Sequence, residues 1–401
     1  MKSKLPRLLA ALLALAPLAA SSVFAAENYE AMLPPGTKKL QLGDSAPDFK
    51  LLGIDGKMTT LADFKAAPVL MVVFLSNHCP YSHAAETRLL PLAREFAGKG
   101  LAVVSINPNS PESVRVDELG YSKYNDSYEE MKLYARDQGF PFPYLYDGDT
   151  QIASMAYGAL ATPHVMLFDR DRKLRYSGRV DDSRFEDPKT VTSHDTRNAV
   201  VEMLAGQPVS KPITPVLGCS TKWNHKRGDN AKVEARWKSE PVELATIDAK
   251  GVAELAKNTS NRLRLVNVWA TWCAPCVEEF PALVSLSRRM GGREFELVTI
   301  SMDDPKMLPQ AKKFLENQHV VPSSKLKGLL KAEGRTAVNF LYTEASADAL
   351  VQALDPQWPG PLPHTVLIAP GGKILWRHNG IVNSQELLNK VLDSLGVYYT
   401  P

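Results

Sequence analysis

The chain is poor in cysteine, and it has no excess of charge once its first residues are set aside. It holds four cysteines among 401 residues. A chain of this length can bury adequate hydrophobic cores without disulfide staples, so we expect these cysteines to do chemistry. Residues 1–25 hold three of the 47 basic residues and none of the 44 acidic ones, which leaves 44 of each sign. Without a net positive field, the chain is not expected to bind nucleic acid.

The sequence also lacks a glycine-rich phosphate-binding motif, and its C-terminal half has one CxxC without a second CxxC or CxxH. The first absence gives no reason to expect a nucleotide, and no cofactor is predicted. The second argues against a four-ligand zinc site, which is the usual alternative for a CxxC spacing.

Residues 1–25 have the layout of a secretory signal peptide. Three basic residues precede the apolar run LLAALLALAPLAA, and the small residues of VFA follow it. The run is short and is interrupted by Pro17, so a retained membrane anchor is the weaker alternative. No cysteine follows the run for attachment of a lipid. We expect an exported, periplasmic protein that is cleaved near Ala25.

The rest of the sequence contains one pattern twice. A buried strand, a helix, a second strand, a second helix, a hairpin and a final helix follow each other in both halves. The two leading strands are expected at 69–75 and 264–272, and the helices behind them at 80–97 and 274–290. This alternation is typical of an α/β fold with helices on both sheet faces. We expect domains at 40–206 and 243–401, joined by a linker at 207–242 that carries Cys219.

The stretch WATWCAPC at 269–276 places two cysteines at the start of the second leading helix. A helix N-terminus offers free N–H groups and a partial positive charge, which favour a thiolate. We therefore expect Cys273 to be the exposed nucleophile with a lowered pKa. Cys276 lies one turn further on and would resolve the mixed disulfide.

The stretch NHCPYS at 77–82 has the same layout with one cysteine, because Ser82 stands at the resolving position. The same dipole argument makes Cys79 a candidate reactive thiolate. One reaction open to it is peroxide reduction, with a sulfenic acid resolved by a distant cysteine. The peroxiredoxin pattern PxxxTxxC is only partly kept, since Ser76 supplies the hydroxyl but Val72 replaces the proline.

Two other reactions are open to Cys79. One is thiol–disulfide exchange with Cys219 as the resolving thiol. The other is metal binding, because Cys79 and His83 are four residues apart on one helical face and His164 could lie opposite.

WATWCAPCVEEFPAL, followed at a distance by PLPHTVLIAPGGKI, resembles the thioredoxin-like domain of TlpA/ResA-type exported thiol–disulfide oxidoreductases. The resemblance implies a cis-proline at Pro363 opposite the CxxC. It also implies an active-site glutamate at Glu278 or Glu279, for which a favourable charge in the first helical turn is the alternative. A membrane thiol transducer is the electron source that the resemblance implies.

NHCPYSHAAETRL, the ATPHV stretch and GCSTKW, in this order, resemble the redoxin (AhpC/TSA-like) family of thioredoxin folds. The resemblance implies a cis-proline at Pro163. Ala161 stands where many members have a second cysteine, so Cys219 is the only candidate partner for Cys79 in this half.

These observations together predict an α/β protein with two thioredoxin-like domains in tandem. Its expected function is thiol–disulfide exchange with protein thiols and disulfides through Cys273 and Cys276. Cys79, resolved by Cys219, is a second redox centre or a relay to the C-terminal pair. Two alternatives remain: a thiol peroxidase reduced by the C-terminal domain, and a metal-binding or cytochrome-maturation scaffold.

Overall fold

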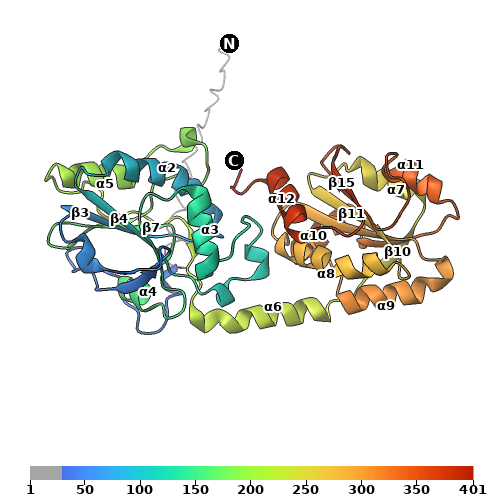
Figure 1. The fold of residues 1–401 in the computed structure, drawn as a ribbon, viewed down its shortest axis with the longest axis horizontal. Helices are drawn as coiled ribbons and strands as arrows, with labels where there is room; N and C mark the ends of the chain where they lie inside the picture. The colour runs from blue at the N-terminus through green and yellow to red at the C-terminus, as the bar shows by residue number, and fades with distance from the viewer. Residues whose placement is uncertain (1–28, 401) are drawn as a thin grey trace, which may run out of the picture.

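The structure is a computed structural model that describes residues 29–400. The expected signal peptide lies outside the described residues, so export stays a prediction. Within residues 29–400, no helix has both the length and the hydropathy needed to cross a membrane. The described part forms two units, each a mixed sheet covered by helices (Figure 1). The expected α/β class is confirmed.

The N-terminal unit is built on a seven-stranded sheet with the order β2-β1-β5-β4-β3-β7-β8. The central strand β3 pairs in parallel with β4 and antiparallel with β7. The strands are β1 (Lys50–Gly53), β2 (Met58–Thr60), β3 (Val69–Phe74), β4 (Leu101–Asn107), β5 (Tyr144–Tyr146), β7 (His164–Phe168) and β8 (Leu174–Gly178).

Alternate residues of β3 supply two different cores, because successive side chains of a strand point to opposite sheet faces. Val69, Met71 and Val73 pack beneath α2, α3 and α5, whereas the residues between them pack beneath α4, together with side chains of β1. The helices are α2 (Pro80–Phe96), α3 (Tyr128–Gln138), α4 (Ile152–Tyr157) and α5 (Asp195–Leu204), with 3₁₀ turns η1 (Leu61–Phe64), η2 (Pro111–Ser113), η3 (Val116–Glu118) and η4 (Pro188–Thr190).

The C-terminal unit has a six-stranded sheet with the order β10-β13-β12-β11-β14-β15. Its central strand β11 is parallel to β12 and antiparallel to β14, which is the arrangement of β3 in the first unit. The duplication expected from the sequence is therefore present in the fold. The strands are β10 (Leu244–Ile247), β11 (Leu263–Trp269), β12 (Phe295–Ser301), β13 (Asn339–Tyr342), β14 (His364–Ile368) and β15 (Ile374–Asn379).

Helices cover both faces of this second sheet. One core contains side chains of α8, α9 and α12, and the other contains side chains of α7 and α11. The helices are α7 (Ala249–Lys257), α8 (Ala274–Arg289), α9 (Leu308–Gln318), α10 (Ser324–Ala332), α11 (Ala347–Leu354) and α12 (Ser384–Leu395), with the 3₁₀ turn η6 (Pro305–Met307).

The segment 207–242, expected as a linker, has regular structure. Its strand β9 (Cys219–Ser220) pairs with β6 (Ala161–Thr162) of the N-terminal unit. After the turn η5 (Asn224–Lys226), the helix α6 (Arg227–Ser239) runs beside both units (Figure 1). None of its residues is buried, which is typical of a polar helix that bridges two units. Cys219 thus packs on the N-terminal unit, and α6 with its flanks is the covalent connection between the two units.

The two units also touch at the end of α8. The Arg289 guanidinium donates to the carbonyl oxygens of Leu119 and Ser122, and the Arg293 guanidinium donates to that of Gly120. A Cβ added at Gly120 would lie 2.9 Å from the Arg289 carbonyl oxygen, so the glycine allows this close approach.

Candidate active sites

The C-terminal site lies where β11 leads into α8. Cys273 is the N-cap residue of α8 and is joined to Cys276 by a disulfide, with Cα atoms 5.2 Å apart. The Cys276 backbone N–H donates to the Cys273 sulfur at 3.3 Å. Cys273 is 5% exposed and Cys276 is fully buried. The expected exposure of Cys273 is absent in this bonded form, but Cys273 is the more accessible of the two.

Both expected prolines are preceded by cis peptide bonds, Thr162–Pro163 and Leu362–Pro363. Each lies at the matching position of its sheet. His364 of β14 is opposite Val268 of β11, and His164 of β7 is opposite Phe74 of β3. The antiparallel register therefore puts each proline beside the end of the central strand that leads to the cysteine.

The two candidate glutamates have different surroundings. Glu278 is exposed, whereas Glu279 is buried on α8, one turn after Cys276. The Asn267 side-chain amide and the Val382 backbone N–H donate to the Glu279 carboxylate at 2.7 and 3.0 Å. Burial outweighs these two hydrogen bonds and raises the pKa of Glu279. Of the two, only Glu279 is buried.

The N-terminal site repeats this geometry at the start of α2. Cys79 is the N-cap residue of α2 and is fully buried. Its sulfur lies 3.1 Å from the carbonyl oxygen of Thr162, the residue before Pro163. The Ser76 and Thr162 hydroxyls are hydrogen-bonded at 2.8 Å. Ser82, at the resolving position, has a buried hydroxyl without a hydrogen-bond partner among the described residues.

Cys219 reaches this site from β9. In the β6–β9 pairing, Cys219 is directly opposite Thr162, whose carbonyl oxygen contacts the Cys79 sulfur. A Cβ added at the neighbouring Gly218 would lie 2.4 Å from that same carbonyl oxygen, so only glycine lets the two strands come this close. The structure therefore brings Cys79 and Cys219 together, both as free thiols.

The pKa values of the two thiols are shifted in opposite directions. Burial favours the neutral form of Cys79, but a hydrogen bond from Cys219 and the charge of His78 outweigh it and lower the pKa of Cys79 to about 6. The hydrogen bond to Cys79, together with burial, raises the pKa of Cys219 well above its ordinary value. The pair thus favours a thiolate on Cys79 and a proton on Cys219.

A buried His78–Asp126 pair beside Cys79 was not anticipated from the sequence. His78 Nδ1 lies 2.6 Å from Asp126 Oδ2, and both residues are almost fully buried. Burial would lower the pKa of His78, but the Asp126 carboxylate outweighs it and raises that pKa. The Asn77 backbone N–H and the side-chain amides of Asn107 and Asn109 also donate to Asp126. The only signal in the sequence is that His78 directly precedes the cysteine.

The geometry gives no support to a metal site at Cys79. His83 Nε2 lies 2.8 Å from the Asn77 carbonyl oxygen, and its Nδ1 lies 3.1 Å from that of Val397. His164 is occupied by the Leu160 N–H and the Ser177 hydroxyl. Residues 29–400 contain no group of three or more His, Cys, Asp or Glu side chains that could hold a metal ion.

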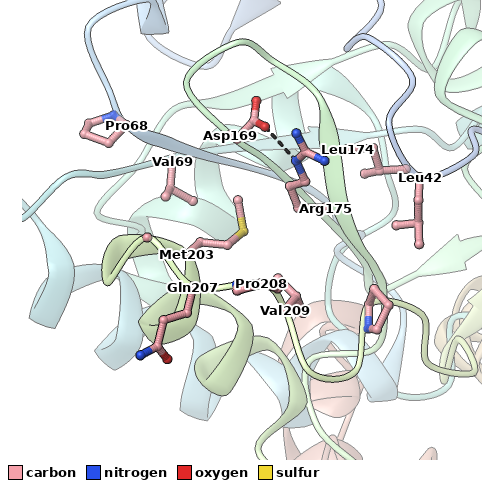
Figure 2. A pocket seen from close by; sticks show the side chains of 12 residues that line it. Leu42, Pro68, Val69, Asp169, Leu174, Arg175, Met203, Gln207, Pro208 and Val209 are labelled. Atoms are coloured by element: carbon pink, nitrogen blue, oxygen red, sulfur yellow. Dashed lines mark hydrogen bonds and ion pairs between the residues drawn. The ribbon is translucent and has the colours of Figure 1, made fainter.

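A cavity of about 470 Å³ lies elsewhere on the N-terminal unit (Figure 2). Leu174, Met203 and Val209 are among its apolar lining residues, and Asp169 and Arg175 form an ion pair of 2.6 Å at its edge. None of the four cysteines lines it, so it is separate from both thiol sites.

Comparison with known families agrees with the duplication. Residues 42–177 match the AhpC/TSA family, and residues 241–392 match the Redoxin family. The tandem arrangement of two thioredoxin-like domains expected from the sequence is therefore confirmed, and both domains match redoxin-type families.

Individual relatives are distant. The chain is 27% identical over 134 residues to the thiol-disulfide oxidoreductase ResA of Bacillus subtilis, covering 33% of this chain and 55% of that protein. It is also 27% identical over 151 residues to a Mycobacterium tuberculosis protein named as a peroxiredoxin. This match covers 34% of this chain and 96% of that protein. A solved structure of a hypothetical protein from Sinorhizobium meliloti 1021 is 38% identical and covers 47% of this chain and 97% of that one, with a TM-score of 0.42.

The chain thus spans about half the length of its ResA relative and nearly all of its peroxiredoxin relative. The first of these relatives is named as a thiol–disulfide oxidoreductase and the second as a peroxiredoxin.

Proposed function

Because this chain carries an AhpC/TSA domain and a Redoxin domain in tandem, we propose that it is a thiol–disulfide oxidoreductase with two thiol centres, Cys273–Cys276 and Cys79–Cys219. The observation that carries the proposal is the position of Cys219 opposite Thr162, whose carbonyl oxygen contacts the Cys79 sulfur. It gives the N-terminal cysteine the second sulfur that its own helix lacks.

At the C-terminal centre, the reduced Cys273 thiolate attacks one sulfur of a protein disulfide. A mixed disulfide forms, the substrate S–S bond breaks, and the first substrate thiolate leaves and takes up a proton. Cys276 then attacks the Cys273 sulfur and releases the second substrate thiol. Two electrons pass to the substrate, and the Cys273–Cys276 bond is formed. A dithiol donor, in our proposal a membrane thiol transducer, returns the pair to the reduced form.

At the N-terminal centre, Cys79 takes the place of Cys273 and Cys219 that of Cys276. The pKa of about 6 supports Cys79 as the attacking thiolate at neutral pH. The raised pKa of Cys219 keeps a proton on the resolving sulfur until the mixed disulfide removes the negative charge on Cys79. Two electrons pass to the substrate here as well, and a Cys79–Cys219 disulfide is the product.

We propose that the two centres act separately in this arrangement of the units. Cys273 lies at the start of α8, whereas the N-terminal unit contacts Arg289 at its end. A helix of 16 residues is about 24 Å long, which is far beyond disulfide contact. A direct relay between the pairs would need the units to move apart and rotate.

Export to the periplasm is part of the proposal and rests on the signal-like residues 1–25. It suits the chemistry, because disulfides persist in that compartment.

Disulfide mapping by mass spectrometry, in redox buffers of graded potential, tests the proposal. We expect both a Cys79–Cys219 bond and the Cys273–Cys276 bond to form and break reversibly. If Cys79 and Cys219 stay free while Cys273–Cys276 cycles, the chemistry is confined to the C-terminal domain.

A thiol peroxidase is the second candidate, favoured by the lowered pKa of Cys79 and by the peroxiredoxin relative. The Cys79 thiolate would attack the peroxide O–O bond, become a sulfenic acid and release an alcohol or water. Condensation with Cys219 would then form the disulfide and release water. Peroxide consumption that is lost in Cys79→Ser would support this reaction, and no consumption by the wild-type protein would exclude it.

A further inference from the structure

The segment that follows α12 leaves its own unit and lies against the N-terminal unit. In Figure 1, the red C-terminal end lies between the two halves. Tyr399 forms an isolated parallel bridge with Phe185, and the Val397 carbonyl oxygen lies 3.1 Å from His83 Nδ1. We call residues 396–400 the crossing segment.

Aromatic side chains hold the crossing segment. The Tyr399 ring lies between the rings of Tyr81 and Tyr121, with centroids 5.1 and 5.0 Å away. The Tyr398 ring meets His83 edge-on at 6.4 Å. Edge-to-face and tilted contacts at these distances are favourable for aromatic pairs.

An arginine of the C-terminal unit fixes the start of the crossing segment. Arg293 donates to the carbonyl oxygens of Leu395 and Gly396 at 2.6 and 2.9 Å. Its guanidinium also lies over the Tyr121 ring, 3.8 Å from the centroid. The same side chain donates to Gly120 of the N-terminal unit, so it joins the segment to the surface that the segment covers.

This surface adjoins the start of α2, where Cys79 is the N-cap residue. Tyr81 is in the first turn of α2, two residues after Cys79, and Cys79 is fully buried. Burial and the charges of Cys219, Tyr121, Tyr81 and Cys79 raise the pKa of Tyr399.

We propose that the surface formed by Tyr81, Tyr121, His83 and Phe185 is a groove for an extended peptide with neighbouring aromatic side chains, and that the crossing segment fills it within this chain. The inference rests on the proposed function, in which Cys79 and Cys219 exchange disulfides. When a protein recognises an extended peptide, backbone hydrogen bonds supply affinity and alternate side chains supply specificity. The crossing segment makes one backbone bridge, to Phe185, and aromatic contacts through Tyr398 and Tyr399. A substrate segment of this kind displaces the crossing segment and thereby gains access to Cys79.

Alkylation of Cys79 in the full-length chain tests whether the crossing segment shields this cysteine. Iodoacetamide is added without reductant, so that Cys273–Cys276 stays bonded, and the labelled Cys79 peptide is quantified by mass spectrometry. We expect Tyr399→Ala to be labelled about tenfold faster than the wild-type protein, since one ring that packs between two others is lost. Tyr399→Phe, which keeps the ring, should label at nearly the wild-type rate.

Leu375→Ala, which removes an exposed apolar side chain on β15 of the same unit, is the matched control and should leave the rate unchanged. An unchanged thermal unfolding midpoint shows that Tyr399→Ala is folded. Equal labelling of Cys79 in the folded Tyr399→Ala and wild-type proteins would overturn the inference.

A synthetic peptide tests the groove itself. In the folded full-length Tyr399→Ala protein, the peptide LGVYYT, which copies residues 395–400, should slow the labelling of Cys79, and LGVAAT should not. Protection by neither peptide, or by both equally, rejects the aromatic groove. Failure of the proposed function looks different, since Cys79 and Cys219 would then stay unbonded in every redox buffer whatever the labelling rates.

Discussion

The two thiol centres share a strand, a helix N-terminus and a cis-proline, but they differ in the origin of the second sulfur. Cys276 lies one turn along the same helix as Cys273, and the two are bonded. Cys219 comes from the two-residue strand β9, which pairs with β6 beside Pro163. The C-terminal centre thus depends on one helix, whereas the N-terminal centre depends on a long-range contact.

The difference also extends to the surroundings of each nucleophile. Cys79 lies beside the buried His78–Asp126 pair and beneath the crossing segment. At the C-terminal centre, the side chain of Trp272, next to Cys273, is 69% exposed. A self-contained pair can stay open to many partners, whereas a pair assembled from distant segments can be covered and controlled by one of them.

The largest effect is expected when each nucleophile is removed separately. Cys273→Ser should reduce exchange at the C-terminal centre to background and leave Cys79–Cys219 cycling intact, because no sulfur is shared. Cys79→Ser should do the reverse. The measurement is the redox-buffer titration of each disulfide by mass spectrometry.

The double variant Cys79→Ser with Cys273→Ser should lose both activities, and it serves as the control for background exchange. If either single change stopped both pairs from cycling, the centres would be coupled, and their independence would be wrong.

The next largest effect is expected for Gly218→Ala. This change tests the β6–β9 pairing, which brings Cys219 to Cys79, without altering either cysteine. Its added Cβ would lie 2.4 Å from the Thr162 carbonyl oxygen. Relieving such overpacking costs about 1–3 kcal/mol, so Gly218→Ala should lower the yield of the Cys79–Cys219 disulfide about tenfold or more on mild oxidation. The Cys273–Cys276 bond should form as in the wild-type protein.

Gly228→Ala is the matched control, because a Cβ there meets nothing within 4 Å. It should leave both disulfides unchanged. Normal formation of the Cys79–Cys219 bond in Gly218→Ala would mean that the β6–β9 pairing is not what brings the two sulfurs together.

The sequence was sufficient to predict the parts of each site that are encoded locally. A run of buried residues gives the strand, and a cysteine followed by a proline gives the helix start, as for Cys79 and Cys273. Pro163 and Pro363 followed from a resemblance and are preceded by cis peptide bonds.

The parts that depend on tertiary packing could not be predicted. Asp126 lies in an irregular region, and only the fold brings its carboxylate to His78. The helix α6 has no apolar face and so gives no hydrophobic periodicity to detect. Nothing in the sequence of residues 396–400 indicates that they lie on the other unit.

A moderate effect is expected when Cys219 is replaced and the pKa of Cys79 is followed by alkylation. Its pKa of about 6 means that the thiolate forms as pH rises through 6, so the alkylation rate should rise between pH 5 and pH 7 and then level off. Cys219→Ala removes a hydrogen-bond donor to the thiolate, and the midpoint should move upward by about one pH unit.

Cys219→Ser keeps a hydroxyl donor, so its midpoint should stay closer to that of the wild-type protein. Cys219→Ala with an unchanged midpoint would show that Cys219 does not stabilise the Cys79 thiolate. In that case, His78 would be the main source of the low pKa.

The smallest effect is expected at Glu279, which gives the C-terminal centre its own buried ionisable group. Its raised pKa means that the folded state favours the protonated carboxyl. The stability contributed by this group is therefore complete below its ordinary pKa and is lost as pH rises through the folded-state value. Glu279→Gln cannot ionise and should not show this loss.

The variant keeps one acceptor oxygen for two donors, Asn267 and Val382, so it should be less stable than the wild-type protein at pH 4. The difference in apparent Tm between the wild-type protein and the variant should shrink by about 2 °C between pH 4 and pH 8. Only the wild-type protein loses stability through ionisation of Glu279 over that range. Thermal unfolding followed at both pH values measures this difference. Glu278→Gln, on the exposed face of the same helix, should show no such trend. If the two variants had equal pH dependence, the Glu279 carboxyl would be no different from a surface charge, and the C-terminal centre would depend on its two cysteines and the helix N-terminus alone.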